Sequence, residues 1–594
     1  MSKTYLALTI GPIYKTIQRA RKTRELWAAS FLLSLFMKKL LTALKIYSKE
    51  GKTLSPNIAT LGENTKYHGA GIWNDNCYLE VEDGKLEAMK AALPGIIKKT
   101  KEDIIDLALF AFSEKESPLS EDELRSLLRQ HFHCHAVLFS SADQNVQMLK
   151  QLSTLTASAE MRDLFPSRHD DFVSEVLFRG AAIWELYREG FDPFDKVFTY
   201  FNGKRDKRLP SLLEIGVREF RNQEVYDDIE NIISEKIRLK KDETDEENQE
   251  IIQKLKNLEK INGKSQFKKR HKYLAIVQSD GDGVGNLIQS ETDSETIKTL
   301  SAKLMAFSKA AVDKIVGFDG LPVYAGGDDL LFIAPLRNSE KKNIFDLIKQ
   351  IQGVYAAQEL PSSTSLSFGI SIFYYKYPLG EAIENGRELL NKLSKKLAFQ
   401  KKGEEIGFPT VWDEDSYSAK NALSFRVMLH AGQSFAAVMR QDGDSFNLWK
   451  ALLETHESVQ SDAAFVSGVI HTLERLEWLL EQACIDGTTE YFFKHHFNEA
   501  KGKQEVFIQR VRELAEAIFE EYGALFPPDK KGKSVHQREV IKFFRSQLEL
   551  REEDFPDHAF SDPQIQQKLL TKFRSNLLYS ALRIIQFLNA DDHE

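Results

Sequence analysis

The chain has 594 residues, and this length predicts several domains. Its 80 lysine and arginine residues against 88 aspartate and glutamate residues give a net charge of −8, which excludes a protein that holds nucleic acid through bulk positive charge. A hydrophobic share of 42% excludes a disordered chain, and three cysteines are too few for a disulfide framework, so we expect a cytoplasmic protein.

Residues 1–165 predict a mixed α/β domain that opens with a strand. The expected elements, in chain order, are a strand over 3–10, a helix over 13–48, a loop-rich stretch over 51–84, helices over 85–112 and 121–130, and a strand over 131–140. The apolar run over 26–36 is too short to cross a bilayer, which takes about 20 residues. We therefore expect a buried helix there and no contact with a membrane.

Residues 166–268 predict a mostly helical intermediate domain that ends in a charged linker. The segment 236–272 is dense in lysine, glutamate, aspartate and asparagine, which is typical of a solvent-exposed helix and linker. Its basic end, 268–272, offers an alternative as a contact for a phosphate backbone, but runs of charge usually face water.

Residues 269–405 predict a second domain, with a β-α-β-β-α-β-α order. The expected elements are a strand over 273–278, a helix over 293–316, strands over 322–325 and 330–334, a helix over 340–358, a strand over 364–375 and a helix over 379–398. This is the ferredoxin-like pattern with one extra helix, and polymerase and cyclase palms share it.

Residues 406–594 predict a C-terminal helical bundle, because apolar residues recur at three- and four-residue spacing over 465–482 and 564–587. The strand-then-helix openings at Tyr5 and Tyr273 suggest two related units. The predicted fold is thus α+β, with two ferredoxin-like palm domains, helical insertions and a C-terminal helical bundle.

Carboxylates stand at two places where a palm holds metal ions. Asp280 follows the first strand of the second domain, while Asp328 and Asp329 occupy the turn between the next two strands. Neighbouring strands lie about 4.8 Å apart, so these side chains can share two Mg²⁺ or Mn²⁺ ions. Such ions neutralise the charge of a triphosphate and align an attacking hydroxyl with the leaving pyrophosphate in nucleotidyl transfer.

Glycines accompany both sets of carboxylates. Gly281, Gly283 and Gly285 let the backbone approach a phosphate where the chain turns into a helix. Gly326 and Gly327 allow positive φ in the hairpin and keep space open above the metals. Either motif alone has a simpler interpretation, as an ordinary hairpin turn or a calcium loop, but the EF-hand spacing is absent and the two motifs together favour the catalytic interpretation.

Lysines and histidines give weaker signals. Lys395 and Lys396 end the last palm helix, where one of them could reach a triphosphate or simply face water. Three histidines alternate along the strand expected over 131–140, namely His131, His133 and His135. They could form a metal site, but clear partner ligands are missing. His169 and Asp170 resemble the core of an HD phosphohydrolase motif, without its further ligands.

Taken together, these residues resemble the large palm-containing subunit of type III CRISPR effector complexes, specifically of the type III-B (Cmr) branch. Three stretches carry the resemblance: 8–13 with 20–28, then 273–285 with 325–332, and finally 367–370 with the lysine-rich helix that follows.

The resemblance implies a function. Such subunits assemble with other Cmr subunits and a CRISPR RNA, and a complementary target RNA switches on the palm. The palm then converts ATP into cyclic oligoadenylate, or in some relatives joins AMP to S-adenosylmethionine, with release of pyrophosphate. By resemblance, Asp280 and Asp328 hold the two metals, Asp329 assists, and the Gly281 carbonyl adds a ligand.

Departures from the family pattern shape further expectations. The first palm begins at about residue 4, so we expect no HD nuclease domain and no DNA cleavage, and the zinc-binding cysteines of many relatives are missing, so we expect no zinc. The first palm has Gly11 and Pro12 where the second has its carboxylate, so we expect it to bind no catalytic metals and either to complete the nucleotide pocket or to face the second palm. The alternatives are a catalytically silent RNA-binding scaffold subunit and a free-standing dinucleotide cyclase.

Overall fold

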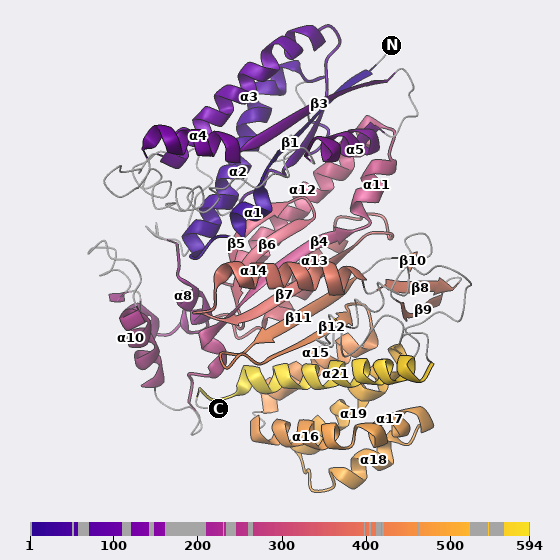
Figure 1. The fold of residues 1–594 in the computed structure, drawn as a ribbon. Helices are drawn as coiled ribbons and strands as arrows, with labels where there is room; N and C mark the ends of the chain where they lie inside the picture. The colour runs from indigo at the N-terminus through magenta and orange to yellow at the C-terminus, as the bar shows by residue number, and fades with distance from the viewer. Residues whose placement is uncertain are drawn as a thin grey trace.

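The described residues form two main sheets and one small separate sheet, with helices between and around the main sheets (Figure 1). The computed structural model describes residues 3–49, 53–56, 70–109, 120–141, 148–160, 209–229, 231–232, 245–258, 265–396, 398–402, 405–410, 417–418, 421–459, 463–522, 545 and 563–592. The expected α+β class is confirmed.

The N-terminal region has a three-stranded antiparallel sheet in the order β2-β1-β3. Its elements are β1 (Lys3–Gly11), α1 (Ile13–Ile17), α2 (Thr23–Leu44), β2 (Asn76–Glu80), α3 (Leu86–Leu109), α4 (Glu121–His131), β3 (His133–Ser141) and α5 (Met148–Glu160). A bridge between Ser55 and Tyr78 places one more short stretch beside β2. With this stretch included, the order of the strands is the same as in a ferredoxin-like sheet, as predicted for a first palm.

Two predictions for this region are wrong. The single helix expected over 13–48 is broken between α1 and α2, because the Glu25 carboxylate accepts the backbone N–H groups of Arg21 and Lys22 and so starts a new helix. The stretch expected to be loop-rich contains β2, whose five residues alternate too briefly to stand out from their polar surroundings.

α2 is the most apolar long helix of this region. The helix and its following turn, residues 23–47, are long and apolar enough to cross a membrane by composition alone, but 78% of the apolar window is buried inside the protein. This burial is typical of a core helix, as expected.

The second palm carries a six-stranded sheet in the order β12-β11-β7-β4-β6-β5. Its elements are β4 (Tyr273–Asp282), α11 (Val284–Ser290), α12 (Ser294–Gly317), β5 (Leu321–Gly326), β6 (Asp329–Pro335), α13 (Ile344–Ala356), β7 (Ser365–Tyr374) and α14 (Leu379–Glu388). α14 continues into a π-helical turn (Leu389–Leu393) and a 3₁₀ turn (Ser394–Lys396). The predicted order of elements is confirmed, with the short helix α11 added.

The expectation that the chain is helical beyond about 410 is wrong for residues 422–440. These residues form β11 (Ala422–Met428) and β12 (Ser434–Arg440), and β11 pairs in parallel with β7. β12 is apolar on both faces from Phe435 to Met439 and so lacks the alternation that marks a half-exposed strand, whereas β11 does alternate, because Ser424 and Arg426 separate its apolar residues. The palm sheet therefore continues past the predicted boundary at 405/406. A separate small sheet of β8 (Ala398–Lys402), β9 (Glu405–Thr410) and β10 (Tyr417–Ser418) lies between them in sequence.

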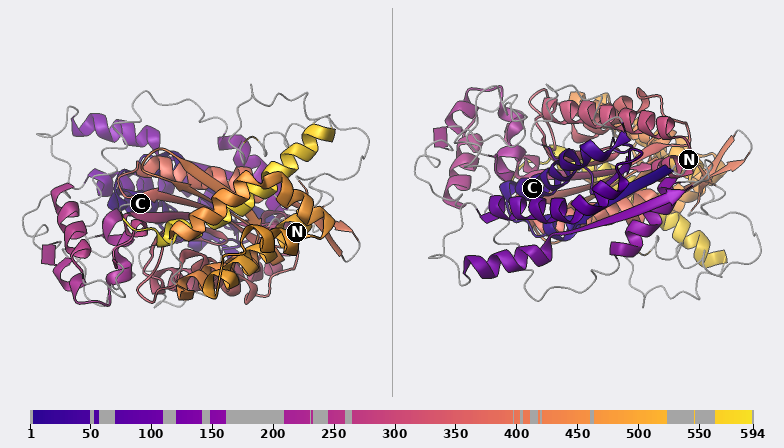
Figure 2. Two further views of the ribbon diagram at one scale, coloured as in Figure 1. Left: turned by 90° about the horizontal axis from the view of Figure 1, so that it is seen from below. Right: turned by 90° about the horizontal axis from the view of Figure 1, so that it is seen from above.

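The large sheet is buried on both faces. Tyr273, Ala275 and Val277 of β4 face a core formed with α12, α13 and the C-terminal helices, whereas Leu274 and Ile276 face a core shared with α2. In Figure 2, the N-terminal region lies in front of the large sheet in the view from above, and the C-terminal helices lie in front of it in the view from below. This sandwich explains the unbroken apolar sequence of β4.

The C-terminal segment is helical from residue 444, as predicted. Its helices are α15 (Asp444–Val459), α16 (Ala463–Arg475), α17 (Glu477–Asp486), α18 (Thr489–His496), α19 (Lys503–Glu521) and α21 (Pro563–Asn589). α21 packs on β12 and so covers that edge of the sheet.

The intermediate region is helical where it is described, with α8 (Leu212–Gly216), a 3₁₀ turn (Arg218–Phe220) and α10 (Asp245–Lys256). The expectation that 268–272 faces water is wrong. Arg270 and His271 are buried because both bind the Glu219 carboxylate, at 2.8 Å each, and Lys268 and Lys272 pair with Asp591 and Asp592.

Candidate active site between the two palm-like units

The three predicted carboxylates lie together at one end of the large sheet. β4 pairs with β6 from Leu274 to Ser279, which places Asp280 beside the turn that joins β5 and β6. Gly281 lies against that turn, because a β-carbon added to it would be 2.8 Å from Asp328 Cβ and would overlap the Asp328 carboxylate. The structure thus brings Asp280, Asp328 and Asp329 together, and their catalytic roles stay predictions.

The negative charges of the three clustered carboxylates disfavour one another. Burial, together with the nearby Asp280 carboxylate, raises the pKa of Asp328 to about 6. Burial and the two neighbouring carboxylates also raise the pKa of Asp329 well above its usual value. Crowded carboxylates that resist ionisation are typical of sites that bind a cation.

The donor set fits a magnesium-type ion better than a zinc-type ion. Among the described residues, no three histidine, cysteine, aspartate or glutamate side chains form a ready-made metal site. Mg²⁺ takes one or two protein carboxylates and completes its shell with phosphate oxygens and water. Asp280 and Asp328, with the Gly281 carbonyl between them, supply such a set.

Lys395 is the lysine that reaches the cluster. Its ammonium pairs with the Asp280 carboxylate and lies 3.5 Å from the Gly281 carbonyl oxygen. The neighbouring Lys396 is exposed. Of the two predicted lysines, the structure therefore brings only Lys395 to the carboxylates.

The glycines differ in what the structure requires of them. Gly283, which precedes α11, and Gly327, in the hairpin turn, have φ values of +74° and +69°, which favour glycine. Gly326 lies too close to the Tyr324 ring for a β-carbon, whereas Gly285 faces open space. The expected positive φ is thus confirmed for Gly327 and wrong for Gly326, which ends β5 and is restricted by close packing instead. The room at Gly285 does not by itself require glycine.

A cavity of about 500 Å³ lies over the carboxylates, between the two palm-like units. The N-terminal region contributes the segment 10–14, Asp75 and His133, and the second palm contributes Asp280, Asp329, Arg387 and Asn391. The first palm therefore faces the second across this cavity, as expected. Sequence reasoning missed Asp75, Arg387 and Asn391, because each comes from a loop or helix without a motif.

Direct contacts hold the two walls of the cavity together. The Ala325 N–H donates to the Gly71 carbonyl at 2.8 Å, and the Gly71 N–H donates to the Val323 carbonyl at 3.0 Å. The Arg387 guanidinium lies 3.8 Å from the centre of the Tyr14 ring. The first unit is thus joined to β5, the strand next to the carboxylate turn.

A further carboxylate, Asp282, was not singled out from the sequence. It is buried and accepts hydrogen bonds from the Ser365 and Ser367 hydroxyls, at 2.8 and 2.6 Å, and from the Asn421 N–H at 2.9 Å. Burial raises its pKa. Asp282 therefore ties the end of β4 to β7 and to the start of β11.

The histidines do not form a metal centre with other described residues. His131 lies 3.0 Å from the Thr16 hydroxyl, and the rings of His133 and His135 are 5.8 Å apart. His169 and Asp170 lie outside the described residues.

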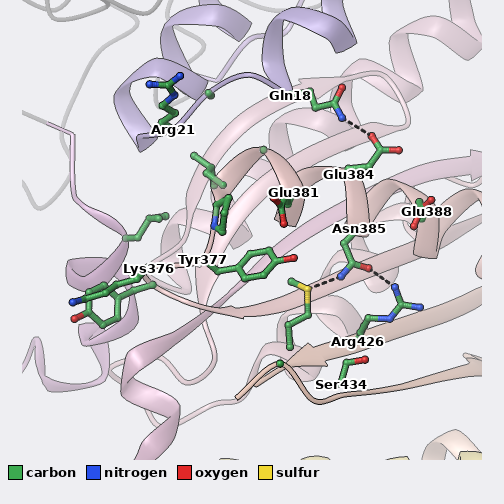
Figure 3. A pocket seen from close by; sticks show the side chains of 18 of the residues that line it. Gln18, Arg21, Lys376, Tyr377, Glu381, Glu384, Asn385, Glu388, Arg426 and Ser434 are labelled. Carbon is green, nitrogen blue, oxygen red and sulfur yellow. Dashed lines mark hydrogen bonds between the residues drawn. The ribbon is translucent and has the colours of Figure 1, made fainter. Parts of the chain in front are cut away.

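A larger cavity, of about 980 Å³, lies away from the carboxylate cluster (Figure 3). It is lined by the 18–21 loop, the start of α14 and the β11–β12 hairpin, and it contains a Gln18–Glu384 contact of 3.1 Å and an Arg426–Asn385 contact of 2.9 Å. α14 therefore begins at this cavity, and its continuation ends at the carboxylates.

Two family models match the chain. The model described as Cas10/Cmr2, second palm domain, matches residues 273–403, and the model described as CRISPR-associated protein Cmr2, N-terminal, matches residues 5–97. The CRISPR system Cmr subunit Cmr2 of Pyrococcus furiosus is 30% identical over 192 residues. That match covers 28% of this chain and 21% of the relative's own length.

One solved structure shows the same fold at low identity. A chain in the apo state of a type III-B Cmr-beta complex matches with a TM-score of 0.51 and 11% identity, over 81% of this chain and 75% of that chain. A chain of the same kind of complex bound to cognate target RNA matches with a TM-score of 0.49 and 11% identity, over 74% and 72%.

Proposed function

We propose that the chain is an RNA-activated nucleotidyltransferase subunit of a type III CRISPR complex, because its N-terminal region and its second palm each match a model of the Cas10/Cmr2 family. The convergence of Asp280 and Asp328 across Gly281, beneath a cavity large enough for a nucleotide, carries this proposal. Its proposed partners are a CRISPR RNA, a target RNA and other Cmr subunits, since the curated relative is named as a Cmr subunit.

In the proposed reaction, an acceptor attacks the α-phosphorus of ATP. The new bond forms at that phosphorus while the bond to the β-phosphate breaks, so pyrophosphate leaves. Bound Mg²⁺ or Mn²⁺ would neutralise the triphosphate and align the acceptor with the leaving group. Asp280 and Asp328 would hold it, with help from Asp329 and the Gly281 carbonyl.

Two cations of the second palm suit a triphosphate. Arg387 lines the cavity, and Lys395 pairs with Asp280, which also lines it. A planar guanidinium and an ammonium can each bind phosphate oxygens. The wall from the N-terminal region lies opposite them, where it would position the second substrate.

The product would be either a cyclic oligoadenylate or AMP joined to S-adenosylmethionine. Both arise from the same attack on the α-phosphorus, so the carboxylates serve either acceptor. Which acceptor is used would depend on the shape of the cavity and on the residues that line it.

The test uses the assembled complex with labelled ATP, Mg²⁺ and target RNA, with and without S-adenosylmethionine, and mass spectrometry of the products. We expect product only with target RNA, and none from the Asp328→Ala/Asp329→Ala double variant, which should still bind RNA. An exposed carboxylate, Asp227, provides the control Asp227→Ala. Product without RNA would favour a free-standing cyclase, and no product from the unaltered complex would favour a silent scaffold.

A further inference from the structure

Lys395 lies at the end of an anchored turn. Ser394, next to it in the chain, donates a hydrogen bond of 2.6 Å to the Phe368 carbonyl and lies 2.8 Å from the Ser424 hydroxyl. The Lys395 side chain is 16% exposed and that of Asp280 is 34% exposed. The backbone at Lys395 is thus held in place by Ser394, and the partly buried Lys395 side chain extends from it to the Asp280 carboxylate.

The ammonium contacts two oxygen atoms at once. It pairs with Asp280 Oδ2 and lies 3.5 Å from the Gly281 carbonyl oxygen. These two oxygens are also the ligands that we propose for a metal ion. Because like charges repel strongly at contact distance, an ammonium and a divalent ion cannot both hold this pair of oxygens.

We propose that Lys395 is a displaceable cation that occupies one metal position until a nucleotide arrives. This inference rests on the proposed function. When a triphosphate binds, its negative charge draws the ammonium away from Asp280 and onto a phosphate oxygen, and the carboxylate is released to the metal ion. Metal and nucleotide therefore enter together, and the carboxylates stay neutralised in their absence.

The chemistry of lysine suits this exchange. An ammonium on a flexible four-carbon stem can turn between two anions without movement of its backbone. The alternative is a permanent ion pair that only supports the fold. The two interpretations predict opposite changes in metal affinity when the lysine is removed. Loss of a structural ion pair would loosen the site and weaken metal binding, whereas loss of a competing cation would strengthen metal binding.

The test measures Mn²⁺ binding to the full chain without nucleotide, from the electron paramagnetic resonance signal of free Mn²⁺. We expect Lys395→Met to bind Mn²⁺ about tenfold more tightly than the unaltered protein, or about 1.4 kcal/mol. Lys392→Met is the matched control, because Lys392 lies one turn earlier and pairs with Glu388 at the surface. That control should leave the affinity unchanged.

The second measurement adds a non-hydrolysable ATP analogue. The analogue should raise the Mn²⁺ affinity of the unaltered protein more than that of Lys395→Met, since only the former must displace a lysine. Lys395→Gln serves as a second variant if thermal melting shows that Lys395→Met does not fold.

Asp280→Asn separates the two proposals. If it weakens Mn²⁺ binding while Lys395→Met has no effect or weakens it too, the displaceable-cation inference is overturned and the proposed function stands. If Asp280→Asn leaves Mn²⁺ binding unchanged, the metal site of the proposed function is itself wrong, and the inference falls with it.

Discussion

Asp328→Asn should stabilise the metal-free protein, although it removes a proposed metal ligand. The pKa of the Asp328 carboxyl is raised from 3.8 to about 6 by burial and by Asp280. A difference of about 2.2 units corresponds to about 3 kcal/mol at most, at 1.36 kcal/mol per unit. Since the side chain is only half-buried, solvent reduces this to about 2 kcal/mol.

The sign of the pH dependence follows from the direction of this shift. Below about pH 4 the carboxyl is protonated in both the folded and the unfolded chain, so the variant has no advantage. Between about pH 4 and pH 6 the unfolded chain ionises this carboxyl while the folded protein keeps it protonated, so stability is lost over this range. The advantage of Asp328→Asn should therefore grow from pH 4 to above pH 6 and then stay constant.

The assay is thermal and urea unfolding in a chelator at pH 4.5 and pH 8, with Asp227→Asn as the surface control. We expect a gain of about 2 kcal/mol in unfolding free energy at pH 8 and a smaller gain at pH 4.5. A variant that is less stable than the unaltered protein at pH 8 would show that the Asp328 carboxylate supports the fold, and the electrostatic account of the site would be refuted.

Three further variants test other parts of the structure. Gly281→Ala should lower the turnover of ATP at least about a hundredfold, because its β-carbon displaces the Asp328 carboxylate, and steady-state assays of the complex would detect this. Arg387→Ala should raise KM for ATP about tenfold with a smaller change in kcat, as measured in ATP titrations. Glu219→Gln should destabilise the protein by about 3 kcal/mol in urea unfolding, because it leaves the buried Arg270 charge without its partner; a neutral result would contradict the buried pair.

The strand order of the second palm and the meeting of its carboxylates could be predicted from the sequence because local signals agree there. Asp280 lies near the end of β4, glycines precede the carboxylates in the hairpin, and the spacing leaves room for one helix and one strand. β12 escaped prediction because its apolar residues follow one another without alternation, whereas β11 does alternate but was missed beside the strongly helical pattern further along the chain.

The opposite wall of the candidate site could not be predicted for a different reason. Asp75 and Arg387 enter the cavity only because separate parts of the chain pack together, and no periodicity or motif encodes that packing. The burial of Arg270 likewise depends on Glu219, which lies 51 residues earlier in the chain. Local sequence reasoning cannot assign such long-range partners.

The two-sided burial of β4 limits how the protein can be divided. A fragment that began at residue 269 would present Leu274, Ile276 and Ile333 to water, since α2 and its neighbours normally cover that face. Such a fragment would be prone to aggregate, and its inactivity would say nothing about chemistry. The second palm of this chain therefore depends on the N-terminal region to cover this apolar face, and any replacement for that region would need an apolar surface of matching shape.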